Sequence, residues 1–137
     1  MDADTTEPGT RYTIPPRTTF ALERIFAHPD FAGPDISSIP VIYSPAFVRA
    51  HLVLVRGSRG SVTRPGRIYT NLAEDVFFAL DFHVLHEFYH VVQQWGRERM
   101  SILGYLFRAG QREREADEFA RQNLGEYRQL LRSWRRA

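Results

Sequence analysis

The sequence predicts a single α+β domain, and three observations support this class. The chain has 137 residues, of which 43% are hydrophobic and 25% charged, a composition typical of one globular domain. Its first two thirds contain short apolar segments with β-branched residues, which are typical of strands. Its last half carries two long stretches with helical periodicity. A small sheet combined with long helices is an α+β arrangement.

The start of the chain is expected to lie outside the folded domain. Residues 1–16 combine Gly, Thr, Pro and acidic residues without periodicity, which predicts a flexible tail. The domain should span residues 17–137, because no repeat or linker divides this range. Thr18 or Thr19 is a candidate cap for a short first helix, which should end before Pro29 because proline cannot continue a helical hydrogen-bond ladder.

The middle of the chain predicts a small sheet. Three short segments rich in apolar and β-branched residues are expected to be strands, at 41–43, 51–55 and 67–70. The Ser-Pro pair that follows the first of them predicts a helical turn over residues 44–50. Two glycines within residues 57–60 predict a turn before the last strand.

The remainder of the chain is predicted to be helical. Residues 75–94 contain no Gly or Pro, and their apolar side chains cover two adjoining sides of a helix, so we expect one central and mostly buried helix. Residues 100–107 predict a short helix interrupted at Gly104. An amphipathic C-terminal helix is expected from about residue 111 onward, because apolar residues recur there at helical spacing.

The composition excludes several kinds of site and partner. The chain has no cysteine, which excludes disulfides, thiolate zinc sites and cysteine nucleophiles. All 18 basic residues are arginines, yet the formal net charge is only +2, and no dense basic stripe of the kind that binds nucleic acid is present. No apolar run is long enough for a bilayer, and the first residues do not resemble an ordinary signal peptide. We therefore expect neither a nucleic acid nor a membrane as partner, and a protein that is cytoplasmic or exported without such a signal.

A metal-binding motif lies within the predicted central helix. His86-Glu87-Phe88-Tyr89-His90 has the pattern H-E-x-x-H. Histidines four residues apart lie on one side of a helix, so both imidazoles can reach a single zinc ion. Glu87 lies about 100° further round the helix, within reach of a water on the metal without being a ligand itself.

A second cluster begins the C-terminal helix, where residues 113–117 have the sequence E-R-E-A-D. Glu113 and Asp117 are four apart and therefore share a helix face. A catalytic zinc site takes three protein ligands and keeps a fourth position open. Glu113 supplies the third ligand after the two histidines, with Glu115 as the alternative. Asp117 is placed to accept a hydrogen bond from an imidazole N–H.

Together these two patterns resemble the gluzincin metallopeptidases, whose third zinc ligand is a glutamate on a following helix. The string HEFYHVVQQ at 86–94 and the E-R-E-A-D sequence followed by Phe119-Ala120 are most similar to the small bacterial peptidase domains of the eCIS core type. The resemblance covers residues 67–124. It implies a minimal zincin-like fold, with a small mixed sheet packed on the H-E-x-x-H helix and a C-terminal helix that bears the glutamate. It also implies that the strand at 67–70 forms the rim of a cleft to which an extended peptide adds.

The resemblance further implies the role of each motif residue. Zn²⁺ is the expected cofactor, bound by His86, His90 and Glu113. Glu87 becomes the general base, and Asp117 supports a ligand histidine, most directly His86. The implied activity is zinc-dependent hydrolysis of peptide bonds by a metal-activated water, with a peptide or protein as the substrate.

Some features of the chain leave alternatives open. His83 lies on the zinc side of the central helix, and His83, Tyr89 and Tyr105 are candidates for the cleft or for stabilising the oxyanion, with ordinary packing as the alternative. A second class of function is a non-catalytic zinc-binding domain with a structural or partner-binding role. A homodimer or a regulatory partner could complete or block so small a cleft.

Overall fold

A computed structural model of the chain describes residues 9–27, 31, 35–52, 60–64, 66–94 and 102–135. These residues form five α-helices, one short 3₁₀ helix and four strands. The predicted α+β class is therefore confirmed.

The bounds of the elements follow the chain order. The strands are β1 (Thr10–Tyr12), β2 (Val41–Tyr43), β3 (Ser61–Arg64) and β4 (Arg67–Thr70). The helices are α1 (Pro16–Ile25), the 3₁₀ helix η2 (Ile36–Ser38), α2 (Pro45–Leu52), α3 (Glu74–Ala79), α4 (Asp81–Gln94) and α5 (Ile102–Ser133).

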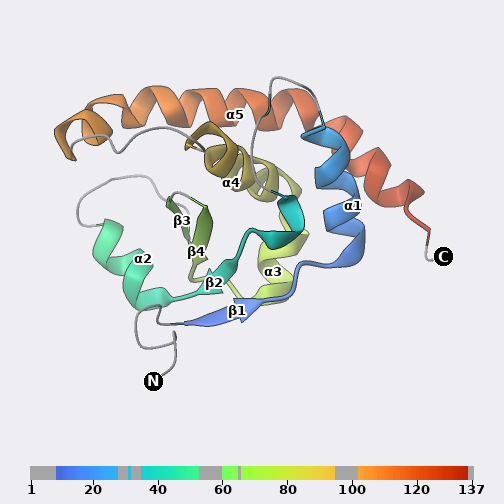
Figure 1. Cartoon of the computed structure of the whole chain (residues 1–137), viewed down its shortest axis with the longest axis horizontal. Helices are drawn as coiled ribbons and strands as arrows, with labels where there is room; N and C mark the ends of the chain where they lie inside the picture. Colours follow the sequence, from blue (N-terminus) through green and yellow to red (C-terminus); the bar gives the residue numbers. More distant parts are fainter. Residues whose placement is uncertain are drawn as a thin grey trace.

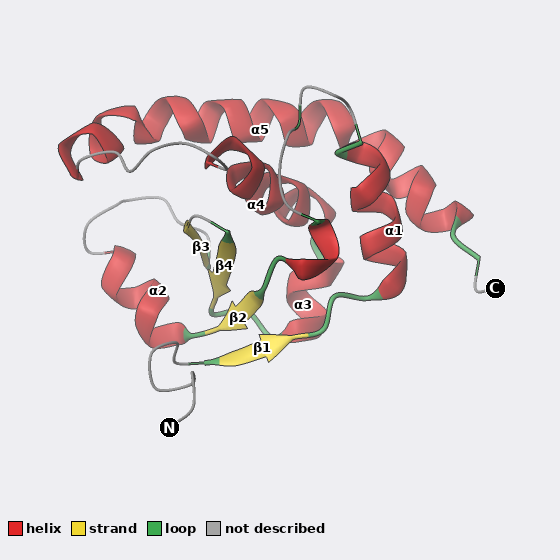
Figure 2. Cartoon of the chain, viewed as in Figure 1, coloured by secondary structure: helices red, strands yellow, loops and turns green. Residues whose placement is uncertain are grey.

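Helix α4 lies in the middle of the molecule. Figure 1 shows α5 across the top of the view, α4 directly beneath it, and the sheet below α4. The contacts agree with this picture, because α4 packs against α5 on one side and against β3 and β4 on the other. Helix α1 crosses α5, and α2 packs on β3 and β4 (Figure 2).

The sheet is mixed and has the strand order β1-β2-β4-β3. The pairs β1-β2 and β4-β3 are antiparallel, whereas β2 and β4 are parallel. The register places Val41, Ile68 and Thr63 in one row across the sheet. Since side chains alternate between the faces of a strand, Ser61 and Thr63 share one face of β3 while Val62 lies on the other.

Each face of the sheet supports its own apolar cluster. The main core joins β2 and β4 to helices α1, α3, α4 and α5, and it includes Val41, Ile68, Leu85 and Phe88. A smaller cluster beneath α2 joins Ile42, Val48, Val62 and Tyr69. The burial predicted for the central helix is confirmed for Phe77, Val84, Phe88 and Val91, each 0% exposed.

The beginning of the chain differs from the prediction of a flexible tail over 1–16. Residues 10–12 form β1, which pairs with β2. The Tyr12 hydroxyl donates to the carbonyl of Leu72 at 2.8 Å, and the Thr13 N–H donates to the Glu74 carboxylate at 3.0 Å. These contacts join the segment to residues some sixty positions away in sequence, which local periodicity does not reveal.

Helix α1 also begins earlier than predicted. Its first residue is Pro16, and the Thr19 N–H donates to the carbonyl of Pro15 at 3.0 Å, so the expected caps at Thr18 and Thr19 are wrong. Proline is favoured at the first position of a helix because its fixed φ suits the helix and its missing N–H would be unpaired there.

The strand predicted at 51–55 is wrong at its start, because residues 51 and 52 belong to α2. No glycine or proline ends the helix before that point; residues 53–55 lie outside the described residues. A strand that was not predicted, β3, follows at Ser61–Arg64. Its apolar signal is weak, because only Val62 contributes to a hydrophobic cluster.

The helical half differs in two ways from the prediction. The helix expected over 75–94 is broken at Leu80, which separates α3 from α4. Conversely, the expected interruption at Gly104 is absent and α5 is continuous from Ile102, since an isolated glycine weakens a helix by only about 1 kcal/mol.

Among the described helices, α5 included, none combines the length and the apolar character needed to cross a membrane.

The expected cleft rim is also corrected. Strand β4, predicted for this role, lies between β2 and β3 and hydrogen-bonds to both. Its backbone groups are therefore used within the sheet. The edge strand next to α4 is β3.

The role of β1 in the sheet can be tested at Gly9. This residue has φ +124°, and a Cβ atom there would lie 2.2 Å from the carbonyl oxygen of Tyr43 in β2. We expect Gly9→Ala to lower the free energy of unfolding by about 1 to 3 kcal/mol, because a side chain is strained in this conformation. The measurement is urea denaturation monitored by circular dichroism.

Gly125→Ala is the matched control. Gly125 lies within α5, and nothing lies within 4 Å of an added Cβ atom. The change should raise the free energy of unfolding by about 0.5 to 1 kcal/mol. If Gly9→Ala behaved like this control, residues 9–12 would not be held in the sheet.

Candidate metal centre

Helix α4 presents both motif histidines on one side. The side chains of His86 and His90 are 10% and 8% exposed, and their Nε2 atoms are 3.1 Å apart. The two rings meet at 84° with their centroids separated by 4.7 Å. The four-residue spacing therefore brings the two imidazoles to one point, as the sequence predicts.

Helix α5 supplies the carboxylate. One oxygen of Glu113 lies 3.3 Å from His86 Nε2, and its other oxygen contacts His90 Nε2. The ligand atoms of the three residues all lie within 4.8 Å of one another. Two imidazole nitrogens and one carboxylate oxygen are a donor set that suits zinc and related divalent metals. The three side chains could thus bind a metal ion.

Hydrogen bonds behind the histidines support this interpretation. His86 Nδ1 is 2.9 Å from Asp117 Oδ1, the contact that the sequence predicts, and His90 Nδ1 is 3.0 Å from Gln93 Oε1. Each oxygen is an acceptor, so we assign the hydrogen of each ring to Nδ1. Both Nε2 lone pairs then point into the space next to Glu113. A shared cation offsets the repulsion between two lone pairs and a carboxylate, so the donor set fits a metal.

The surrounding charges shift the pKa values of the cluster. Burial lowers the pKa of His86, but the hydrogen bond that the protonated ring donates to Glu113 and the charges of Glu87, Glu113 and Asp117 outweigh it, so the net shift is upward from 6.5. Burial raises the pKa of Glu113, but hydrogen bonds and charge from the two histidines lower it far below its usual range. Glu113 therefore stays an anion, which is the form that binds a metal.

Glu87 lies beside the ligand group without belonging to it. Its side chain is 7% exposed, and its Oε2 atom is 3.8 Å from His86 Nε2. The other oxygen, Oε1, accepts a hydrogen bond of 2.8 Å from the Thr63 hydroxyl on β3. Since Thr63 faces α4, the edge strand fixes the orientation of this carboxylate.

The structure separates the two candidates for the third ligand. Glu113 joins the ligand group, whereas Glu115 accepts a hydrogen bond of 2.7 Å from the Gln93 side chain. Positions two apart on a helix are separated by about 200° around its axis, so these two glutamates contact different residues of α4.

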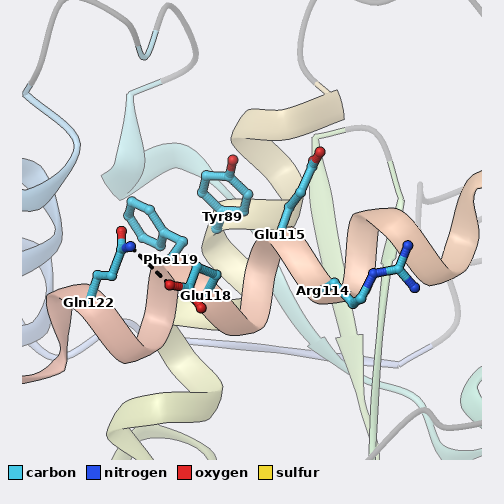
Figure 3. Close-up of a pocket in the computed structure, with 6 residues that line it drawn as sticks. All are labelled: Tyr89, Arg114, Glu115, Glu118, Phe119 and Gln122. Atoms are coloured by element: carbon cyan, nitrogen blue, oxygen red, sulfur yellow. Dashed lines mark hydrogen bonds between the residues drawn. The ribbon is translucent and has the colours of Figure 1, made fainter.

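The remaining candidates are not members of the three-residue ligand group. His83 Nε2 is 2.7 Å from Ser61 Oγ on β3, and its ring meets the edge of Phe77. Tyr89 stacks on Phe119, with ring centroids 4.4 Å apart, and lines a surface pocket (Figure 3). These contacts give both residues partners in the fold, and their role in the cleft or on the oxyanion stays a prediction. Tyr105 belongs to α5, but its side chain lies outside the described residues.

Three polar contributors were not predicted: Gln93, Thr63 and Ser61. Gln93 follows His90 by three residues, and helix positions three apart are neighbours, so its contact with that ring could have been proposed from spacing alone. The two β3 residues carry no such signal, because they meet α4 only through the tertiary fold.

No protein-family model, curated protein or solved structure matches the chain. The resemblance to gluzincins therefore stays a prediction from the motif residues. The candidate metal centre rests on its own contacts, in which two imidazoles and a carboxylate from two helices converge.

Metal content tests the ligand set directly. The purified chain should bind one Zn²⁺ ion, and His90→Ala and Glu113→Ala should each abolish stoichiometric binding, because two remaining ligands hold the ion weakly. Elemental analysis after dialysis measures this. Chelation should also lower the melting temperature of the wild type, since an ion that binds only the folded state stabilises it.

Glu118→Ala is the control for that experiment, because Glu118 is exposed on the same helix and bonds only to neighbours on α5 among the described contacts. It should retain the full metal content. Full zinc binding by Glu113→Ala would contradict the assignment of the third ligand.

The acidic surroundings of His86 predict a pH dependence of metal binding. His86 must be neutral to bind through Nε2, and its pKa is raised above 6.5, so protons compete already above that pH. Zinc affinity should be highest in alkaline solution and fall on acidification, with the onset above pH 6.5. Asp117→Asn removes one of the charges that raise this pKa and should move the onset to lower pH. Chelator competition between pH 5.5 and 8.5 measures both curves; coincident onsets would contradict the prediction.

Proposed function

We propose that the protein is a zinc-dependent peptidase in which His86, His90 and Glu113 hold Zn²⁺ and Glu87 is the general base. The observation that carries this proposal is the pairing of a three-ligand cluster with a separate, oriented carboxylate. A site with a purely structural metal needs four ligands and no base. Here the described cluster offers three, and Glu87 lies 3.8 Å from a ligand nitrogen.

Glu87 would perform the proton transfers. When bound, zinc supplies a Lewis acid that polarises the scissile carbonyl and acidifies a water molecule. Glu87 takes a proton from that water and later gives it to the leaving amine. Thr63 donates to Oε1, which leaves Oε2, the oxygen nearer to His86, to carry the proton.

The exposure of the cluster favours catalysis over a structural role. The side chains of Glu113 and Asp117 are 48% and 44% exposed, whereas those of the histidines are nearly buried. Metal bound at this place would thus be supported by α4 from within and accessible from the side of α5. Catalytic zinc sites keep such an open position, while structural sites are closed.

A peptide substrate would add to β3 rather than to β4. Strand β3 is the edge strand of the sheet that packs on α4, and Thr63 within it contacts the proposed base. An extended peptide that pairs with an edge strand gains backbone hydrogen bonds without needing a deep pocket. The proposed substrate is therefore a protein or peptide.

Glu87→Gln tests the catalytic role. The amide cannot accept the proton, so cleavage of a peptide library, read by mass spectrometry, should fall by about 10²- to 10⁴-fold. Zinc content should remain that of the wild type, because Glu87 is not a ligand. EDTA should abolish cleavage by the wild type, and added Zn²⁺ should restore it.

The two functions that the sequence leaves open give different results in this experiment. A peptidase cleaves only with zinc and intact Glu87. A non-catalytic zinc domain binds one ion, melts at a lower temperature on chelation and cleaves nothing. Cleavage that survives both EDTA and Glu87→Gln would argue for a contaminating enzyme and against the proposal.

A further inference from the structure

The hydrogen bond behind His90 is made by an amide, which distinguishes it from the one behind His86. Asp117 accepts from His86 through a carboxylate, and a carboxylate is an acceptor at either oxygen. Gln93 accepts from His90 through Oε1, but its other terminal atom, Nε2, is a donor. A rotation of the amide by half a turn would therefore present a donor to the ring.

The orientation of this amide decides which ring nitrogen is free. With Oε1 toward His90, the ring carries its hydrogen on Nδ1 and its Nε2 lone pair is available to a metal. With Nε2 of Gln93 toward the ring, Nδ1 would have to accept, and the hydrogen would move to the ligand atom. Gln93 thus supports metal binding in only one of its two orientations.

Glu115 selects that orientation. The Gln93 Nε2 atom donates to Glu115 Oε1 at 2.7 Å, and the second oxygen of Glu115 accepts from Gln111 at 3.3 Å. The reversed amide would place an oxygen against this carboxylate and lose the hydrogen bond. Gln93 is 9% exposed, so water compensates poorly for such a loss.

We propose that Gln93 and Glu115 form a relay that positions His90 for metal binding, in which the Glu115 carboxylate holds the Gln93 amide with its oxygen toward the ring. Glu115 is a positioning residue, because it acts through Gln93 and does not touch the ligand atoms. This inference rests on the proposed function, since it concerns the zinc site of the proposed peptidase.

Glu115 can be changed without disturbing the core. It lies on the exposed face of α5 at the rim of the pocket, close to Tyr89 and one turn from Glu118 (Figure 3). In the same view Glu118 accepts a hydrogen bond from Gln122, a neighbour on its own helix. Glu118 is therefore a matched control that shares the charge and the helix of Glu115.

The decisive variant reverses the orientation of the Gln93 amide that the relay favours. In Glu115→Lys the new ammonium group can only donate, so the Gln93 oxygen should turn toward it and the amide donor toward His90. Zinc affinity should fall by about 10- to 100-fold, the usual effect of losing a partner behind a ligand. Glu118→Lys makes the same charge change one turn away and should stay within about threefold of the wild type.

The double variant Gln93→Glu with Glu115→Lys tests the mechanism of that loss. The introduced carboxylate accepts from His90 in either orientation and also from the lysine, so zinc affinity should return toward the wild-type value. A chromophoric chelator measures the dissociation constant of Zn²⁺ at one pH. Exchange of the His90 Nδ1 proton, observed by ¹H–¹⁵N NMR of the zinc-loaded protein, should accelerate in Glu115→Lys and slow again in the double variant.

Each outcome decides the inference. Equal zinc affinities for Glu115→Lys and Glu118→Lys would overturn it, because the relay would then have no effect. A double variant as weak as Glu115→Lys would also overturn it, since the loss would come from charge and not from the amide. A wild type that binds zinc through the relay but cleaves no peptide would contradict the proposed peptidase function alone.

Discussion

The close antiparallel packing of α4 on α5 is the constraint on which the candidate metal centre depends. Ala116 and Ala120 on α5 are 0% exposed, and such small side chains let two helix backbones approach. At the far end of the pair, Arg128 on α5 contacts Asp81 on α4 at 3.1 Å, in the same register. A shift of α5 by one residue would rotate its faces by about 100° and carry Glu113 away from the imidazoles.

This packing also explains how the molecule tolerates a polar cluster in its interior. A buried polar group costs stability unless it is hydrogen-bonded, and His86, Glu87 and His90 are all buried residues. The partner of His86 is Asp117 on α5, and that of Glu87 is Thr63 on β3. His90 contacts Gln93 on its own helix. The cluster thus connects the sheet, α4 and α5. A bound metal ion would offset the negative charge and the lone pairs that its ligand atoms bring together.

The parts that the sequence predicts are those that local geometry determines. His86 and His90 share a face because a helix repeats every 3.6 residues, and the same reasoning pairs Glu113 with Asp117. The break at Leu80 and the continuity of α5 through Gly104 were beyond this reasoning. A single residue changes the free energy of a helix by only about 1 kcal/mol or less, so local sequence does not decide whether a helix breaks or continues at these two places.

Strand β3 shows why the unpredicted part coincides with the candidate site. A half-buried strand is recognised by alternating apolar residues, but in Ser61–Arg64 the residues that face α4 are Ser61 and Thr63. Their hydroxyls contact His83 and Glu87, so the positions that would carry the apolar signal carry hydrogen-bonding groups instead. Functional sites are where sequences depart from the patterns of a core. Strand β3 was therefore missed for a physical reason: the side chains that it turns toward α4 are hydroxyls that contact the candidate site, and not apolar residues.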